Sequence, residues 1–265
     1  MIDSHCHLAG QEFIDDLPAV VQRARDAGVA RALVILAADE DEEVARVPRV
    51  SELWPGVRYA IGVHPHAAQR HAADPEAVAN LLAARLAAVP DVRVIGEIGL
   101  DYHYDFSPRD VQQQVFRAQL RFARQRGLPV ALHVREAEDD TLRILAEEGA
   151  GRGLTGVFHC FTGDRGYARR ALDLGFHLSI PGIVTFPRAV ELRDAVAAIP
   201  DDRLLIETDS PYLAPVPYRG KRNEPAFVAR TLATVADARG MDPAALGTRL
   251  IETFDRFVGD TPPSR

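Results

Sequence analysis

Short apolar runs alternate with longer stretches of helical periodicity along the chain. The clearest run, at 32–37, is continuously apolar (Ala-Leu-Val-Ile-Leu-Ala) and is typical of a strand buried on both faces. At 11–27 apolar residues recur at helical spacing, and Gly28 follows as a stop signal. The same criteria predict strands at 1–7, 58–63, 92–97, 130–134, 156–159, 176–180 and 203–207, and helices at 41–53, 75–88, 108–126, 136–148, 166–174, 225–239 and 243–257.

Two prolines sharpen the expected helix boundaries. Pro48 lies inside the helix expected at 41–53 and should break or kink it, because proline lacks the backbone N–H. Pro108 follows Ser107, and this pair predicts a helix start with serine as N-cap and proline in the first position.

The order of these elements predicts the architecture. Eight strand signals are separated by helical stretches, which indicates a parallel sheet. Eight such units that close on themselves form an α/β TIM (β/α)8 barrel, and no linker or low-complexity segment divides residues 1–265, so we expect a single domain. An open doubly wound sheet is the alternative, but no Gly-x-Gly-x-x-Gly follows any strand, which weakens a dinucleotide-binding version of it.

Composition narrows the class of protein. The net charge of −7 argues against a generally basic protein that coats nucleic acid, although not against a local cationic groove. No apolar run approaches 18 residues and no signal peptide is visible. We therefore expect a cytoplasmic protein that associates neither with a membrane nor with an obligate protein partner. Cys6 and Cys160 each adjoin a strand-end histidine, and we expect both to be buried packing thiols.

Metal-ligating residue types recur where the predicted strands end. Because the C-terminal ends of barrel strands meet at one face, six of these side chains should converge there: His5, His7, Glu97, His133, His159 and Asp209. His5 and His7 point the same way, since a strand alternates faces. Four imidazoles and two carboxylates suffice for two divalent metal ions, and Glu97 has two oxygens with which to bridge them. A set of hydrogen-bonded core polar residues is the alternative, but burying six such groups without a metal is costly.

The sequence resembles the TatD family of metal-dependent deoxyribonucleases, which belong to the amidohydrolase-like TIM barrels. The resemblance covers essentially the whole chain and rests on seven motifs in order: IDSHCHL (2–8), GVHPH (62–66), GEIGLDY (96–102), PVALHVR (129–135), FHCFTG (158–163), LIETDSP (205–211) and RGKRNEP (219–225). One departure is visible, because members usually carry Asp two residues after the second motif histidine and this chain has Ala9 there. That position is not a ligand in the family pattern.

The resemblance implies a ligand set and an activity. One metal would take His5, His7, Glu97 and Asp209, and the other Glu97, His133 and His159. The family implies Mg²⁺ or Mn²⁺ in action and 3′-to-5′ exonuclease action on single-stranded DNA, with a link to DNA repair. Ligand chemistry alone leaves the metal open, because four imidazoles also suit Zn²⁺.

Further residues around the predicted centre suggest contacts with substrate. Arg135 follows His133 by two and should face the same way, where a guanidinium suits a phosphate oxygen; an ion pair with Glu136 is the alternative. Of His64 and His66, one is expected to cap the following helix, and we favour His64 as the phosphate contact.

Other predictions concern the second layer and the mouth of the barrel. Glu207 shares a face with Asp209 one layer deeper, so we expect it to support the ligands rather than react. Two sets of residues could contact a DNA strand. The rings of Tyr102, His103 and Phe161 could stack on bases, and the basic cluster of Arg219, Lys221 and Arg222 could bind phosphates. Each set is equally well explained as ordinary loop structure.

Three functions fit these residues. The first is a metal-dependent deoxyribonuclease, with Asp209 and Glu97 as catalytic residues; Asp209 would accept the proton of the attacking water. The second is a small-molecule ester or amide hydrolase of the same barrel type. A version bridged by a carboxylated lysine is excluded, because the one lysine, Lys221, lies in a loop and Glu97 holds the strand position. The third, a non-catalytic metal-binding protein, leaves a complete ligand set unexplained.

Overall fold

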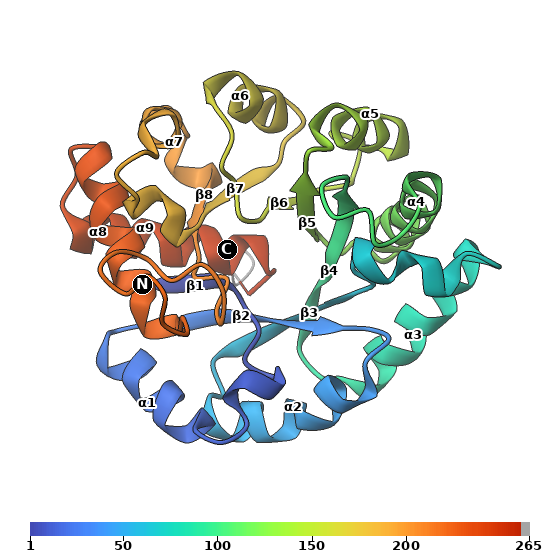
Figure 1. The fold of residues 1–265 in the computed structure, drawn as a ribbon, viewed down its shortest axis with the longest axis horizontal. Helices are drawn as coiled ribbons and strands as arrows, with labels where there is room; N and C mark the ends of the chain where they lie inside the picture. Colours follow the sequence, from blue (N-terminus) through green and yellow to red (C-terminus); the bar gives the residue numbers. More distant parts are fainter. Residues whose placement is uncertain (261–265) are drawn as a thin grey trace, which may run out of the picture.

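The computed structural model describes residues 1–260, in which strands and helices alternate (Figure 1). The strands are β1 (Ile2–Cys6), β2 (Arg31–Ala37), β3 (Val57–Gly62), β4 (Val92–Asp101), β5 (Val130–Arg135), β6 (Gly156–Phe158), β7 (His177–Ile180) and β8 (Leu204–Ile206). The α-helices are α1 (Leu17–Asp26), α2 (Asp41–Leu53), α3 (Val78–Ala88), α4 (Arg109–Arg126), α5 (Glu138–Glu148), α6 (Arg165–Asp173), α7 (Val190–Val196), α8 (Val228–Ala238) and α9 (Pro243–Phe257).

The strands form one parallel sheet in sequence order, which confirms the predicted TIM barrel. The barrel closes between the end of β1 and the segment just after β8. There the backbone N–H of Asp209 donates to the carbonyl of His5 (2.9 Å), and that of His7 donates to the carbonyl of Ser210 (2.8 Å). The helices surround the strands in Figure 1, and the main apolar core lies between these two layers. The alternative of an open doubly wound sheet is therefore excluded.

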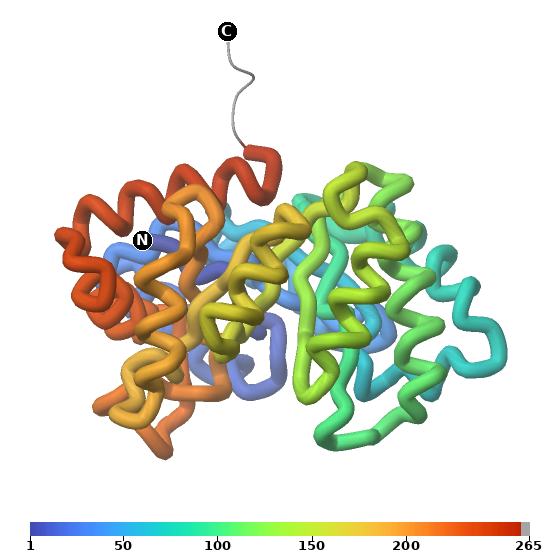
Figure 2. Tube along the Cα trace, turned by 90° about the horizontal axis from the view of Figure 1, so that it is seen from above, coloured from blue at the N-terminus to red at the C-terminus, as the bar shows by residue number. Residues whose placement is uncertain are grey.

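Helix α9 covers the N-terminal end of the barrel. Its Asp255 pairs with Arg31 at the start of β2 (3.1 Å), and Asp260, just beyond the helix, pairs with Arg58 in β3 (2.6 Å). In Figure 2 this helix runs along one edge of the molecule, and the loops that follow the strands lie at the opposite edge. The C-terminal ends of the strands are thus the end available for a site.

Several element boundaries differ from the predictions. The helix expected at 11–27 is a 3-10 turn (Gln11–Phe13) followed by α1, because Pro18 is tolerated in the first turn of a helix but not inside it. Pro48 does not break α2, which continues through it to Leu53 with the proline exposed on its surface. Strand β4 continues to Asp101 instead of ending at Glu97.

One local prediction was wrong, and one helix was not predicted. Ser107 does not cap α4; its hydroxyl donates to the carbonyl of His66 and accepts from the N–H of Gln69 (both 2.9 Å), so it joins two loops instead. Helix α7 was not predicted.

Among residues 1–260, no helix is long and apolar enough to cross a membrane.

Candidate metal centre

The six predicted ligands lie together in one cavity at the C-terminal end of the barrel. His5 belongs to β1 and His7 follows that strand by one residue, while His133 lies in β5. Glu97 lies within β4, and Asp209 comes three residues after β8 rather than at its end. The cavity has a volume of about 770 Å³ and is lined by five of the six, with the fully buried His5 behind them.

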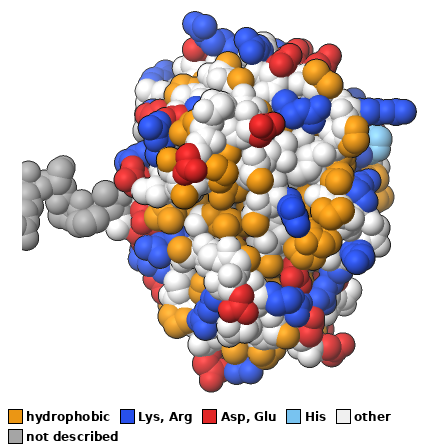
Figure 3. All heavy atoms as spheres, turned by 90° about the vertical axis from the view of Figure 1, so that its left-hand side faces the viewer, with side chains coloured by type: hydrophobic (Ala, Val, Ile, Leu, Met, Phe, Trp, Pro, Cys, Tyr) orange, Lys and Arg blue, Asp and Glu red, His pale blue; other side chains and the backbone are white. Residues whose placement is uncertain are grey.

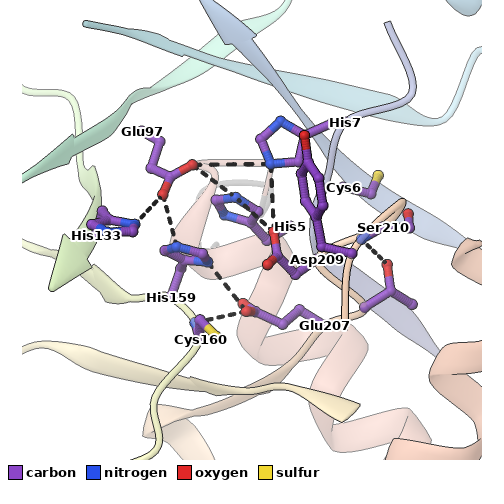
Figure 4. A network of polar contacts seen from close by, with 12 residues as sticks. His5, Cys6, His7, Glu97, His133, His159, Cys160, Glu207, Asp209 and Ser210 are labelled. Atoms are coloured by element: carbon purple, nitrogen blue, oxygen red, sulfur yellow. Dashed lines mark hydrogen bonds and ion pairs between the residues drawn. The ribbon is translucent and has the colours of Figure 1, made fainter. Parts of the chain in front are cut away.

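Glu97 lies at the centre of the cluster, between two groups of histidines (Figure 4). Its Oε1 lies 2.7 Å from Nδ1 of His133 and 2.9 Å from Nε2 of His159. Its Oε2 lies 3.3 Å from Nε2 of His5 and 4.0 Å from Nε2 of His7. One carboxylate thus contributes an oxygen to each of two groups of possible ligands.

Asp209 completes the group that contains His5 and His7. Its Oδ1 lies 3.5 Å from Nε2 of His7 and 3.8 Å from Nε2 of His5. The backbone of Asp209 is in the left-handed region (φ 58°), which aspartate tolerates better than most residues and which is common at functional sites. This conformation belongs to the turn that begins where the barrel closes.

The donor atoms of this cluster are suited to hold metal. His5 is fully buried, yet neither of its ring nitrogens has a hydrogen-bond partner among residues 1–260. A buried imidazole without a partner is costly, and a bound cation would satisfy one of these nitrogens. Three histidine-rich groups place their ligand atoms within 4.8 Å of one another around the predicted positions: His5, His7 and Glu97; His5, His159 and Asp209; Glu97, His133 and His159.

The electrostatics of the cluster favour positive charge between the carboxylates. Burial tends to raise the pKa of Glu97, but the neighbouring imidazoles of His159, His64 and His133 hold it well below its usual value. Burial tends to lower the pKa of His159, but Glu97 and Glu207 raise it well above its usual value. Glu97 is therefore ionised, and either protons or metal cations must balance its charge.

Asp101 is a buried carboxylate that the sequence analysis left without a role. Its Oδ2 accepts from Nε2 of His66 (2.8 Å) and from Nε2 of His133 (3.0 Å). Its Oδ1 accepts from the backbone N–H groups of His103 and Tyr104, both at 3.0 Å. This arrangement keeps the Nδ1 of His133 directed at the metal centre, as carboxylates behind metal-binding histidines commonly do.

Glu207 positions a second predicted ligand, His159, in a similar way. It is fully buried, and its Oε1 accepts from the backbone N–H of Cys160 (2.6 Å) and lies 3.2 Å from Nδ1 of His159. The Nε2 of His159 is thereby left to face Glu97. Cys160 itself lines the cavity and is half-buried, so the prediction that it is a buried packing thiol was wrong, whereas Cys6 is buried as expected.

His64 caps the helix that follows it and also faces the cavity. Its Nδ1 accepts from the N–H of His66 (3.2 Å) and caps the 3-10 helix Pro65–His71. Its Nε2 points into the cavity, 3.4 Å from Oε1 of Glu97. Burial lowers the pKa of His64 to about 4, so the ring is neutral at neutral pH, and because Nδ1 accepts, the proton is on Nε2.

Arg135 lines the cavity, and its guanidinium lies over the ring of Tyr104, 4.6 Å from the centroid. The alternative partner, Glu136, instead bonds His103 (2.7 Å). The basic cluster after β8 does not form one free groove: Arg222 pairs with Asp16 (2.7 Å), and Arg219 stacks over Phe186.

The predicted base-stacking residues are mostly buried. Phe161 is inside the core, and Tyr102 donates its hydroxyl to Asp140 (2.9 Å). Three aromatic residues that the sequence analysis did not select are exposed near the site: Tyr104, Phe106 and Tyr212. Side-chain exposure in a loop depends on the fold around it, so alternation along the chain could not find them.

Known proteins resemble the chain over nearly its whole length. The family model described as TatD related DNase matches residues 2–259. The uncharacterized metal-dependent hydrolase YabD of Bacillus subtilis (strain 168) is 39% identical and covers 91% of this chain and 92% of its own length. The 3′-5′ ssDNA/RNA exonuclease TatD of Pantoea vagans (strain C9-1) is 38% identical, over 94% of this chain and 96% of that protein.

A solved structure agrees with these relatives. The crystal structure of YJJV, a TatD homologue from Escherichia coli K12, superposes with a TM-score of 0.88 at 31% identity and covers 99% of this chain and 98% of that one. The resemblance noted from seven short motifs is therefore confirmed along the chain. The protein belongs to the TatD-related DNase family and is a metal-dependent hydrolase.

Proposed function

We propose that this hydrolase is a deoxyribonuclease that cleaves phosphodiester bonds as a 3′-to-5′ exonuclease on single-stranded DNA. The observation that carries the proposal is the pair of ligand groups sharing Glu97, in a cavity that Arg135 and His64 also line. Two divalent ions, with Mg²⁺ or Mn²⁺ favoured and Zn²⁺ as the alternative, would polarise the phosphate and lower the pKa of water when bound. The polarity and the strand preference are supported by the name of the Pantoea vagans relative.

We expect the ligands to divide between the two ions as the family pattern suggests. His5, His7, Glu97 and Asp209 would hold one ion, and Glu97 would share the other with two histidines, His133 and His159. Asp209 accepts the proton of the attacking water. Burial tends to raise its pKa, but the adjacent His7, His159 and His5 lower it below the usual value, so the carboxylate is ionised and free to accept.

Two further side chains bind the phosphate. The Nε2–H of His64 donates a neutral hydrogen bond toward a phosphate oxygen, since its proton cannot be on Nδ1. The Arg135 guanidinium lies over the ring of Tyr104 and has no carboxylate partner among residues 1–260, so its N–H groups can donate to a second oxygen and stabilise the charge that develops at phosphorus.

The overall negative charge gives the protein little general attraction for DNA, so we expect substrate affinity to come mainly from this cavity. The protein carries a net charge of −7, and on the face shown in Figure 3 basic side chains are interspersed with acidic ones around an apolar area. No field of one sign covers that face. A cytoplasmic location, with both thiols free as they are here, completes the proposal.

A labelled time course tests the activity. Single-stranded DNA carrying a label at either the 3′ or the 5′ end is incubated with EDTA or with added Mg²⁺, Mn²⁺ or Zn²⁺. We expect rapid loss of the 3′ label as mononucleotide, a shrinking ladder from the 5′ label, and no reaction in EDTA. Loss of the 5′ label first would reverse the polarity. Hydrolysis of small esters or amides without DNA cleavage would support the alternative hydrolase instead.

A further inference from the structure

Two aromatic rings lie stacked and exposed beside the metal centre. Tyr104 and Phe106 have centroids 5.3 Å apart and planes only 8° from parallel. Tyr104 is 47% exposed and Phe106 is 64% exposed. Both belong to the loop between β4 and α4, and we call this pair the aromatic shelf. An isolated exposed ring is common on protein surfaces, but two stacked rings at a cavity mouth form a contiguous apolar surface of the kind that binds ligands.

The shelf is close to the proposed phosphate site. Tyr104 lines the cavity, and the guanidinium of Arg135 lies over its ring. The His66 ring meets Phe106 edge-on with centroids 4.8 Å apart and lies 6.0 Å from the ring of His133. A single imidazole therefore separates the shelf from a metal ligand.

The loop that carries the shelf is held in place by hydrogen bonds. Asp101 accepts from the backbone N–H of Tyr104, and Arg109 donates to the carbonyl of Tyr102 (3.1 Å). Arg109 also pairs with Asp105 (3.0 Å), the residue between Tyr104 and Phe106 in the sequence. A surface that is ordered before binding loses little conformational entropy when a ligand arrives, which favours tight binding.

We propose that the aromatic shelf stacks a nucleobase of the strand whose phosphate lies in the metal centre. This inference rests on the proposed deoxyribonuclease function and names the part of the substrate that the protein recognises beside the phosphate. A flat ring next to a phosphate site matches a nucleotide, in which base and phosphate are joined by one sugar. Stacking is tolerant of sequence because every base has a π-face, so the shelf binds strands without selecting a base.

Binding to two strands that differ only in their bases tests the inference. The probes are a fluorescein-labelled phosphorothioate oligothymidylate, which resists cleavage, and a phosphorothioate strand of equal length in which every residue is abasic. Dissociation constants are measured by fluorescence anisotropy in Mn²⁺ for the wild type and for Phe106→Ala, Phe106→Trp and Val190→Ala. Val190 is the matched control, because it is an apolar residue that is 56% exposed but lies in α7 and not in the loop that carries the shelf.

We expect Phe106→Ala to weaken binding of oligothymidylate about fivefold to hundredfold, the range that loss of one stacked base predicts, and to leave the abasic strand unchanged. Phe106→Trp and Val190→Ala should bind like the wild type. Metal content and melting temperature, measured on the same preparations, should not change; if Phe106→Ala fails to fold, Phe106→Leu replaces it with the same expectation.

Two results would overturn the inference while the proposed function stands. One is wild-type affinity of Phe106→Ala for oligothymidylate. The other is an equal loss for both strands, which would mean that the loop contacts the backbone. If the wild-type protein neither binds nor cleaves any DNA, the proposed function is wrong, and the inference about the aromatic shelf is wrong as well.

Discussion

Replacing Asp101 by asparagine tests whether a buried carboxylate behind a ligand sets the strength of the metal centre. Asp101 is fully buried and accepts four hydrogen bonds, two from imidazoles and two from backbone N–H groups. Asparagine has the same shape but only one acceptor oxygen. If that oxygen keeps the backbone donors, the amide NH₂ faces Nε2 of His133, which must then accept. The ring proton moves to Nδ1, the nitrogen that faces Glu97.

The size of the effect follows from these contacts. Loss of a carboxylate behind a metal-binding histidine typically costs about 10- to 100-fold in metal affinity or activity, and here the wrong tautomer of His133 is the cause. Two imidazole donors also lose a charged acceptor, and a hydrogen bond to a charged group contributes roughly 1.5–3 kcal/mol. We therefore expect Asp101→Asn to bind metal 10- to 100-fold more weakly, as above, and to lose about 2–4 kcal/mol of stability.

The assay is calorimetric titration of EDTA-stripped protein with Mn²⁺ or Zn²⁺, together with urea denaturation of the metal-free protein. Asp105→Asn is the matched control, because Asp105 is exposed in the same loop and pairs only with Arg109 among residues 1–260. This control should change metal affinity little. Wild-type metal affinity in Asp101→Asn would refute the reasoning, since it would show that the tautomer of His133 does not depend on Asp101.

Three further predictions concern the base, the phosphate contact and the acid stability of the fold. Asp209→Asn keeps the size of the side chain and one coordinating oxygen, so it should retain DNA binding and at least one metal but lose about 10²-fold or more in single-turnover cleavage; near-normal cleavage would place the base elsewhere. Arg135→Ala should slow DNA cleavage with metal content intact, and an unchanged rate would rule out a phosphate contact. Burial tends to raise the pKa of Glu148, but Arg121 and Arg117 hold it below the usual value of 4.5. The ionised carboxylate therefore stabilises the fold above pH 4.5, and this stabilisation is lost as the pH falls through the pKa of the folded state. Glu148→Gln should therefore lower the free energy of unfolding more at pH 7 than at pH 3 by urea denaturation, and an equal loss at both would contradict this sign.

Local pattern was sufficient to predict the barrel and the convergence of the six candidate ligands. The period of apolar residues distinguishes strands from helices, and the repeated alternation of the two implies a parallel closed sheet. Once the strands are placed, the ends of β1, β5 and β6 must meet at one face, so residues such as His5, His133 and His159 converge without any knowledge of their contacts. These inferences hold because each depends on neighbours along the chain.

Asp101 shows where that reasoning stops. Alternation along β4 places it on the same side as Glu97, and that signal was available in the sequence. Its role depends on His66 and His133, however, which lie 35 and 32 residues away and approach it only when β3, β4 and β5 pair. The sequence alone does not show which histidine nitrogen a buried carboxylate will contact.

The loop after β4 shows that the exposure of a side chain also depends on tertiary structure. Tyr102 and Tyr104 are both aromatic and only two residues apart, yet Tyr102 is buried against Asp140 of α5 and Tyr104 remains at the cavity mouth beside Arg135. The sequence by itself determined that aromatic rings would lie near the metal centre. Tertiary structure decided which ring could meet a substrate, because burial is set by the neighbouring helix and strand and not by the order of residues in the loop.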